Sequence, residues 1–174
     1  MNKHTKNFQS YSLPICLILI LSLSRLIPHP SNFTPMLAVG VFSGFYFRNF
    51  LLSFFIVVFS MFLGDLYLGF HGTMFFTYIS LAVAVALGIF IKHFKFSEIL
   101  LSGLLSSVCF FIITNFGAWL ILDMYEKNFA GLLQSYVLAI PFFHATLIST
   151  FLYLIFLKLL FDLVVKKKTF KTSF

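Results

Sequence analysis

Residues 99–122, ILLSGLLSSVCFFIITNFGAWLIL, contain no charged side chain. An α-helix rises about 1.5 Å per residue, so this stretch is long enough to cross a hydrocarbon layer about 30 Å thick. The chain as a whole has a matching composition, because 60 % of its 174 residues are hydrophobic, 10 % are charged and the mean hydropathy is +1.02. A soluble domain of this size would expose much of that apolar surface to water. The sequence therefore predicts an all-α integral membrane protein.

Comparable apolar runs predict a six-transmembrane-helix bundle that forms one transmembrane domain over residues 1–174. The expected spans are 11–27, 36–47, 50–70, 74–91, 99–122 and 136–157, followed by a basic tail over 158–174. The run at 36–47 would reach only about 18 Å. It either begins earlier, near Ser31, or is a short helix completed by non-helical backbone. The second alternative requires that protein or a polar cavity shield that backbone from lipid.

The formal charge of +7 comes from basic residues at the ends of the apolar runs, a pattern that favours membrane orientation over nucleic-acid binding. Short connections make neighbouring helices antiparallel. One side of the membrane then carries most of the basic residues and both termini, and only Arg25 and Lys127 lie opposite. Because basic residues concentrate on the cytoplasmic side, both termini are predicted to be cytoplasmic. The residues on that side are Lys3, Lys6, Arg48, Lys92, Lys95, Lys166, Lys167, Lys168 and Lys171.

Two spacings predict how the helices pack and how far the last one extends. Lys158 and Asp162 are four residues apart, which supports a helix that continues beyond residue 157. Small residues at four-residue spacing allow helices to approach closely in lipid, either within this bundle or against a separate membrane partner. These pairs are Gly40 and Gly44, Ala82 and Ala86, and Ala84 and Gly88.

Polar side chains are expensive inside a bilayer, so each one requires a partner or a function. Placed along the six spans, they gather in one layer near the outer face, and the inner half has almost nothing comparable. This convergence predicts a ligand pocket. The segment RLIPHPSNFTP at 25–35, stiffened by its prolines, is expected to form a lid over it. The candidate ligand-binding residues are Arg25, His29, Asn32, Thr34, Asp65, His71, Asn115, Trp119 and His144.

Several candidates also have a purely structural interpretation. Arg25 could extend to the interface, or Asp65 could be its ion-pair partner, since an unpaired buried carboxylate tends to take up a proton. Asn115 could form an interhelical hydrogen bond, and His144 could satisfy a carbonyl freed by the nearby Pro141. Trp119 could likewise belong to the aromatic belt at the membrane interface.

The chain lacks the motifs of several enzyme classes. It has no P-loop of the form G-x-x-x-x-G-K-[ST], no H-E-x-x-H, no G-x-S-x-G and no C-x-x-C. His29, His71 and His144 with Asp65 could supply metal donors, but they come from separate elements without ligand spacing. We therefore expect neither metal nor cofactor and no enzymatic activity. An intramembrane enzyme built on Asp65 and His144 is the weaker alternative.

Four stretches carry a family resemblance: RLIPHPSNFTP, GDLYLGFHG, TNFGAWL and GLLQSYVLAIPFFHATL, which are spread over residues 25–147, most of the chain. They resemble an uncharacterised family of small bacterial six-helix membrane proteins. That family is distantly similar to the substrate-binding (S) components of energy-coupling factor transporters. This similarity implies a multi-pass protein of the bacterial inner membrane that captures a vitamin-like micronutrient at its outer face. It also implies a separate coupling subunit and ATPases as partners.

The predicted function is therefore a substrate-capturing subunit for micronutrient uptake, with the lipid bilayer and a small molecule as its partners. The alternative is a structural or assembly membrane protein whose polar layer only holds the helices together. One departure from S components concerns the first span, where residues 12–24, SLPICLILILSLS, lack the Ala-x-x-x-Ala that many S components use for docking.

Overall fold

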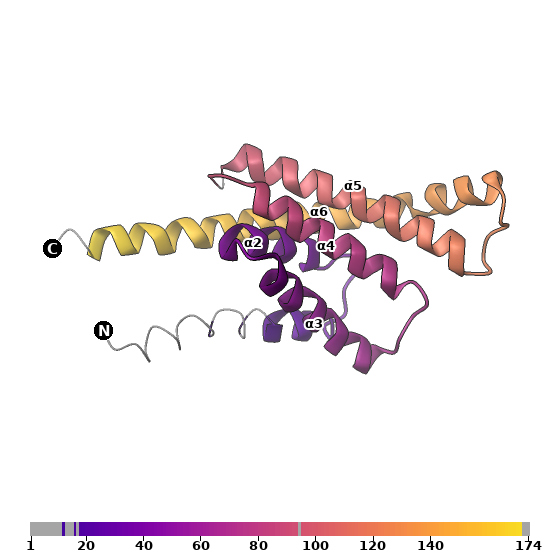
Figure 1. Cartoon of the computed structure of the whole chain (residues 1–174), viewed down its shortest axis with the longest axis horizontal. Helices are drawn as coiled ribbons and strands as arrows, with labels where there is room; N and C mark the ends of the chain where they lie inside the picture. Colours follow the sequence, from indigo (N-terminus) through magenta and orange to yellow (C-terminus); the bar gives the residue numbers. More distant parts are fainter. Residues whose placement is uncertain (1–11, 13–15, 17, 94, 172–174) are drawn as a thin grey trace.

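The computed structural model is helical along most of its length and describes residues 12, 16, 18–93 and 95–171 (Figure 1). Helical residues at 18–24 lead into a non-helical segment that ends at Pro35. The helices that follow are α2 (Met36–Phe47), α3 (Phe50–Leu68), α4 (Met74–Phe90), α5 (Phe96–Ile121) and α6 (Phe129–Lys171).

These bounds confirm the predicted helical segments, with differences at their ends. The helix at 36–47 has the predicted limits, and residues 18–24 fall inside the predicted span 11–27, part of which lies outside the described residues. The last helix is longer than the span 136–157, since α6 begins at Phe129 and ends at Lys171. Lys158 Nζ lies 2.5 Å from Asp162 Oδ2, which confirms the predicted pair beyond residue 157.

Three helices in the described part of the chain are long and apolar enough to cross a membrane: α3, α5 and Phe129–Leu163 within α6. The burial pattern agrees with lipid surroundings. Large hydrophobic side chains face outward, such as Phe129 at 80 % exposure, whereas the hydroxyls of Ser43, Ser53 and Ser60 are fully buried. Soluble domains show the reverse arrangement, and small polar residues between helices are typical of membrane proteins. The chain is therefore built as a membrane protein.

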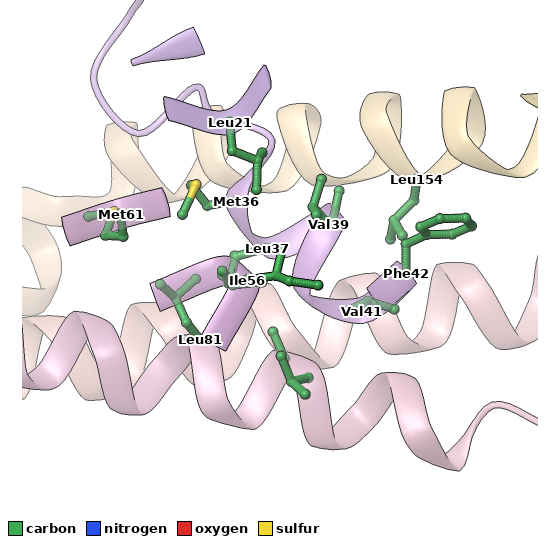
Figure 2. Close-up of a cluster of buried hydrophobic side chains, with 14 of the residues drawn as sticks. Leu21, Met36, Leu37, Val39, Val41, Phe42, Ile56, Met61, Leu81 and Leu154 are labelled. Carbon is green, nitrogen blue, oxygen red and sulfur yellow. The ribbon is translucent and has the colours of Figure 1, made fainter. Parts of the chain in front are cut away.

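Helix α2 lies at the centre of the bundle, in contact with α3, α4, α5 and α6. Every residue from Met36 to Gly44 is buried, and the hydrophobic core surrounds this helix (Figure 2). Of the two alternatives for the second span, the short helix is therefore correct. Neighbouring helices surround it, and the non-helical segment before it lines a cavity described below, as such backbone requires in a membrane.

Helices α2 and α4 pack so closely that no side chain fits at Gly44 of α2 or at Gly88 of α4. A Cβ atom at Gly44 would lie 2.2 Å from the carbonyl oxygen of Val85, and one at Gly88 would lie 2.0 Å from that of Val41. The predicted small-residue spacing is thus used inside this bundle, at least for Gly44 and Gly88.

The helices alternate in direction along the long axis of the molecule. Residues 91–93, which follow α4, and the C-terminal part of α6 lie at one end, and the connections at 69–73 and 122–128 lie at the other (Figure 1). This arrangement is the one that short connections predict. It places the site described next toward the end that carries the 69–73 connection, because His71 contributes to that site.

Candidate functional site

A cavity of about 390 Å³ lies between the 25–34 segment and helices α2 to α6. Its size falls in the range of about 300–1,000 Å³ that is typical of small-molecule sites. Exposed residues such as His29, Asn32 and His71 mark its mouth, whereas Thr150 is fully buried. Its polar lining residues are Arg25, His29, Ser31, Asn32, Thr34, His71, Thr73, Thr77, Thr114, Asn115, Thr146 and Thr150. Its apolar lining residues are Met36, Leu37, Met61, Leu68, Leu81 and Phe110.

The structure brings most of the candidate residues around this one cavity. The candidates that line it are Arg25, His29, Asn32, Thr34, His71 and Asn115, whereas Asp65, Trp119 and His144 do not. Candidate residues from three separate parts of the chain therefore meet at the position where the polar layer was expected.

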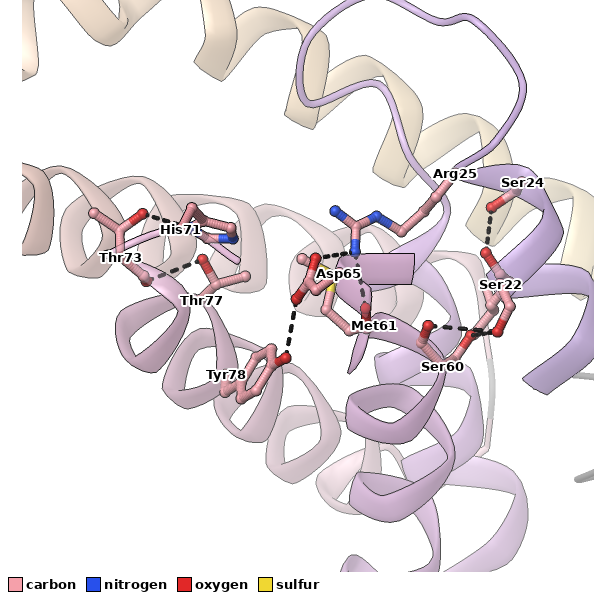
Figure 3. Close-up of polar contacts among 11 residues, drawn as sticks. Ser22, Ser24, Arg25, Ser60, Met61, Asp65, His71, Thr73, Thr77 and Tyr78 are labelled. Carbon is pink, nitrogen blue, oxygen red and sulfur yellow. Dashed lines mark hydrogen bonds and ion pairs between the residues drawn. The ribbon is translucent and has the colours of Figure 1, made fainter. Parts of the chain in front are cut away.

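Asp65 lies beside the cavity as the counter-ion of Arg25 (Figure 3). Arg25 Nη1 is 2.5 Å from Asp65 Oδ1 and also donates to the carbonyl oxygen of Met61 at 2.9 Å. The hydroxyl of Tyr78 on α4 donates to Asp65 Oδ2 at 2.9 Å. Asp65 is 1 % exposed, and a carboxylate this deeply buried needs a counter-charge and hydrogen bonds. Arg25 supplies the charge, and Arg25 and Tyr78 supply the hydrogen bonds. The predicted pairing of Arg25 with Asp65 is confirmed.

A second polar contact holds the N-terminal helical segment against α3, one turn before Arg25. Ser60 Oγ donates to the carbonyl oxygen of Ile18 at 3.0 Å, and the hydroxyls of Ser22 and Ser60 are 3.2 Å apart (Figure 3). Because both contacts join the same two elements, they fix the position from which Arg25 reaches over α3.

The 25–34 segment is shaped by local backbone contacts. The amide of Phe33 donates to the carbonyl oxygen of Pro30 at 3.0 Å, and Asn32 between them has a left-handed φ of 62°, which asparagine tolerates better than most residues. The ring of Phe33 packs against Tyr153 of α6 at 6.3 Å between centroids. The segment is therefore an ordered turn attached to the last helix.

His29 presents a defined hydrogen-bonding edge. Its Nδ1 is 2.9 Å from the carbonyl oxygen of Pro30, and a carbonyl can only accept. Nδ1 must therefore carry the proton. In the neutral ring, Nε2 is then left as an acceptor.

The cavity walls formed by α5 and α6 carry residues whose hydrogen-bond donors are already used. Thr114 Oγ1 donates to the carbonyl oxygen of Phe110 at 2.7 Å, and Thr146 Oγ1 donates to that of Phe142 at 3.0 Å. Such bonds to the carbonyl four residues earlier are common for threonine within helices. Thr150, one turn after Thr146, differs because its buried hydroxyl has no hydrogen-bond partner.

Sequence reasoning missed the threonines of the cavity wall, above all Thr146 and Thr150. The available signal was a pair of hydroxyl residues four positions apart in an apolar run, which places both on one helical face. His144 was expected in the polar layer because of its depth, but it is exposed and lies outside the cavity lining. Residues two positions apart on a helix are separated by about 200°, so His144 faces away from Thr146.

Trp119 lies beyond the cavity and supports the connection between α5 and α6. Its Nε1 donates to the carbonyl oxygen of Glu126 at 3.0 Å, and Lys127 Nζ donates back to the carbonyl oxygen of Trp119 at 2.6 Å. These contacts give Trp119 a structural role at the end of the bundle. Among the described residues, no group of three or more His, Cys, Asp or Glu side chains is placed to hold a metal ion.

Fold and cavity together define a helical membrane protein with an internal polar chamber. The chain belongs to DUF6580, a family of unknown function, whose family model matches residues 5–172. This match confirms the expected membership in an uncharacterised family. No match was found among curated proteins. None was found among solved structures either.

Proposed function

We propose that this protein captures a small polar molecule in its cavity, as the substrate-binding subunit of an uptake system for a vitamin-like micronutrient. The observation that carries the proposal is the fully buried hydroxyl of Thr150, which lines the cavity and has no hydrogen-bond partner. Leaving such a group unsatisfied costs about 1–3 kcal/mol. A ligand in the cavity, together with a small shift of the side chains that cover this hydroxyl, would supply a hydrogen-bond partner.

The proposed orientation is that of a six-span protein of the bacterial inner membrane with both termini in the cytoplasm. The basic residues Lys92 and Lys95 belong to the connection at one end of the bundle, and the cavity mouth with His71 belongs to the opposite end. Basic residues concentrate on the cytoplasmic side of membrane proteins. In this orientation the cavity opens to the outside, as capture for uptake requires.

Uptake against a gradient needs a source of energy. The sequence carries no P-loop, so this chain would depend on a separate coupling subunit and ATPases. That division of labour is the one found in transporters with S components. We propose the same division here on the basis of the outer-face cavity, the expected topology and the distant similarity of the sequence.

The second candidate function is a structural or assembly protein that binds no ligand. It is favoured by the Arg25–Asp65–Tyr78 contacts, which already give a purely structural reason for the charged residues. The two functions differ in what they require of the cavity. A structural protein has no use for an open chamber that reaches Thr150, whereas a capturing subunit depends on it.

Capture from a mixture distinguishes these functions. The full chain, purified in a mild detergent, is incubated with the deproteinised small-molecule fraction of bacterial cells and washed, and the retained compounds are identified by mass spectrometry after denaturation. Thr150→Phe, whose ring would fill the end of the cavity, is the comparison, with circular dichroism and the melting temperature verifying its fold. We expect at least one compound to be retained by the parent and lost in the variant. Identical compound profiles for the two proteins would contradict capture in this cavity.

A further inference from the structure

Hydrogen-bond donors and acceptors are distributed unequally over the cavity walls. On α5 and α6, Thr114 and Thr146 each have a single hydroxyl proton, and both protons are given to backbone carbonyls. Asn115 Nδ2 gives one of its two protons to the carbonyl oxygen of Phe111 at 2.8 Å, which leaves one N–H and the oxygen Oδ1. Among these three residues, acceptors therefore outnumber donors: two hydroxyl oxygens and Asn115 Oδ1 remain against a single N–H of Asn115. This wall favours ligand groups that donate.

The side of the cavity formed by Arg25 has the opposite character. Guanidinium carries five N–H groups, and Asp65 and Met61 are both bonded to Nη1. The other terminal nitrogen points away from Asp65 (Figure 3), and within the described residues neither it nor Nε has a hydrogen-bond partner. Arg25 therefore offers free charge-assisted donors to the cavity, where they favour a ligand group that accepts.

The charge of the lining residues also favours a ligand group that accepts hydrogen bonds. None of the residues that line the described cavity is acidic, and Asp65 stands behind Arg25 without lining it. A cationic ligand group would meet Arg25 with no lining carboxylate to balance it. A carboxylate would instead receive N–H groups in a planar geometry that suits guanidinium. Asp65 stays bonded to Nη1, so a carboxylate on the free edge of Arg25 need not displace it.

We infer that the cavity takes a small carboxylate that also carries N–H or O–H groups, with the carboxylate on Arg25 and the donors on the wall of Thr114, Asn115 and Thr146. The inference rests on the proposed capture function and names the class of its ligand. Thr150, whose hydroxyl can both donate and accept, lies fully buried in the same lining. A simple fatty acid would satisfy Arg25 only, and a neutral amide would leave the guanidinium edge without an anion.

Matched probe sets test this inference on the full chain in nonionic detergent at pH 7. Pantothenate, biotin and N-acetylglutamine are carboxylates with N–H or O–H donors. Their controls are panthenol, biotin amide and N-acetylglutamine amide, which lack the carboxylate, and octanoate, which lacks the donors. Thermal unfolding over a concentration series yields an apparent dissociation constant for each probe. We expect at least one donor-bearing carboxylate to bind about tenfold or more tightly than its neutral counterpart and than octanoate.

Two variants connect the preference to the proposed contacts. In Arg25→Gln combined with Asp65→Asn, both charges disappear together, so no buried carboxylate remains unpaired, and the preference for the acid over its neutral counterpart should vanish. Thr114→Val keeps the shape of the side chain but removes its acceptor oxygen, so it should lower the affinity for the carboxylate probe about fivefold or more. Equal binding of acids and neutral counterparts, a preference that survives in the double variant, or the absence of binding by every acid would overturn the inference.

The capture experiment separates this inference from the proposed function. If the parent retains compounds that Thr150→Phe does not, and none of them is a carboxylate, the cavity captures ligands but the inferred class is wrong. If nothing is retained in the cavity, the function and the inferred class both fail. Retained carboxylates that carry N–H or O–H groups support both.

Discussion

Gly64 lies directly beneath the side chain of Arg25. A Cβ atom at Gly64 would come within 2.9 Å of both Cδ and Nη1 of Arg25, closer than real Cβ contacts allow. The guanidinium cannot simply move aside, because Nη1 is bonded to Asp65 and to the carbonyl oxygen of Met61. The dipeptide Gly64–Asp65 therefore acts as a unit in which the glycine makes room for the cation and the aspartate balances its charge.

Gly64→Ala should displace Arg25 and destabilise the protein by about 1–3 kcal/mol, the usual cost of overpacking. The measurement is the melting temperature of the purified full chain in detergent. The matched control is Gly72→Ala, whose nearest neighbour, Ile121 Cγ2, would lie 3.4 Å from the new Cβ, an ordinary contact. This control should change stability by no more than about 0.5 kcal/mol. Equal melting temperatures for the two variants would show that the space above Gly64 is not needed.

Arg25 and Asp65 should be energetically coupled. Removing one partner of a buried ion pair leaves an uncompensated charge and typically costs about 3–5 kcal/mol. Arg25→Gln and Asp65→Asn should therefore each destabilise the protein, and the double variant should lose less than the sum of the two. Unfolding of the four proteins under one set of conditions provides the cycle. Strictly additive losses would mean that the two residues act independently.

Two buried hydroxyls without hydrogen-bond partners allow a direct comparison of binding with stability. Thr150 lines the cavity and Ser107 does not. Thr150→Val and Ser107→Ala each remove an unsatisfied polar group, so neither should lower the melting temperature of the ligand-free protein. Only Thr150→Val should weaken the binding of a captured ligand, by about 1–3 kcal/mol or roughly five- to 150-fold in affinity. Equal affinities in both variants would exclude Thr150 from the site.

The 25–34 segment should affect binding more than folding. Asn32→Gly keeps the left-handed backbone and removes only the side chain at the cavity mouth, so affinity should fall while the melting temperature stays constant. Pro30→Gly removes no lining side chain but loosens the turn, so it should chiefly raise the dissociation rate. Stopped-flow or surface-based kinetics with a captured compound measures both effects. A drop in melting temperature with unchanged kinetics would instead make this segment a structural element.

The sequence predicted site residues correctly where their depth in the membrane decided their position. It failed where the face of the helix on which a residue lies decided whether that residue reaches the cavity. Arg25 and Asp65 could be paired from sequence, because a charge near one face of the membrane needs a partner at the same depth. His144 could not be placed by depth alone, since the rotation of α6 turns it away from Thr146 and leaves it exposed.

The sequence also could not predict how helices pack around particular residues, as the short helix α2 and the hydroxyl of Thr150 show. Sequence showed that residues 36–47 are too few to span a bilayer, but only the packing of neighbouring helices decides that α2 is central and buried. Threonine in an apolar helix usually bonds its own backbone, as Thr146 does. Nothing in the sequence distinguishes Thr150, whose hydroxyl lacks such a bond and lines a cavity.

The most direct test of an outward-opening cavity is the accessibility of Thr114 in living cells, because this residue lines the cavity and is partly exposed. Cys16 and Cys109 are first replaced by serine, and Thr114→Cys is then treated with a small, charged, membrane-impermeant methanethiosulfonate. His144→Cys on the exposed face of α6 is the control, because its thiol would lie in lipid. We predict that Thr114→Cys reacts from outside intact cells and that a captured compound slows the reaction, whereas His144→Cys stays unmodified. Reaction of Thr114→Cys only in inside-out vesicles, or at a rate that no captured compound changes, would contradict capture at the outer face.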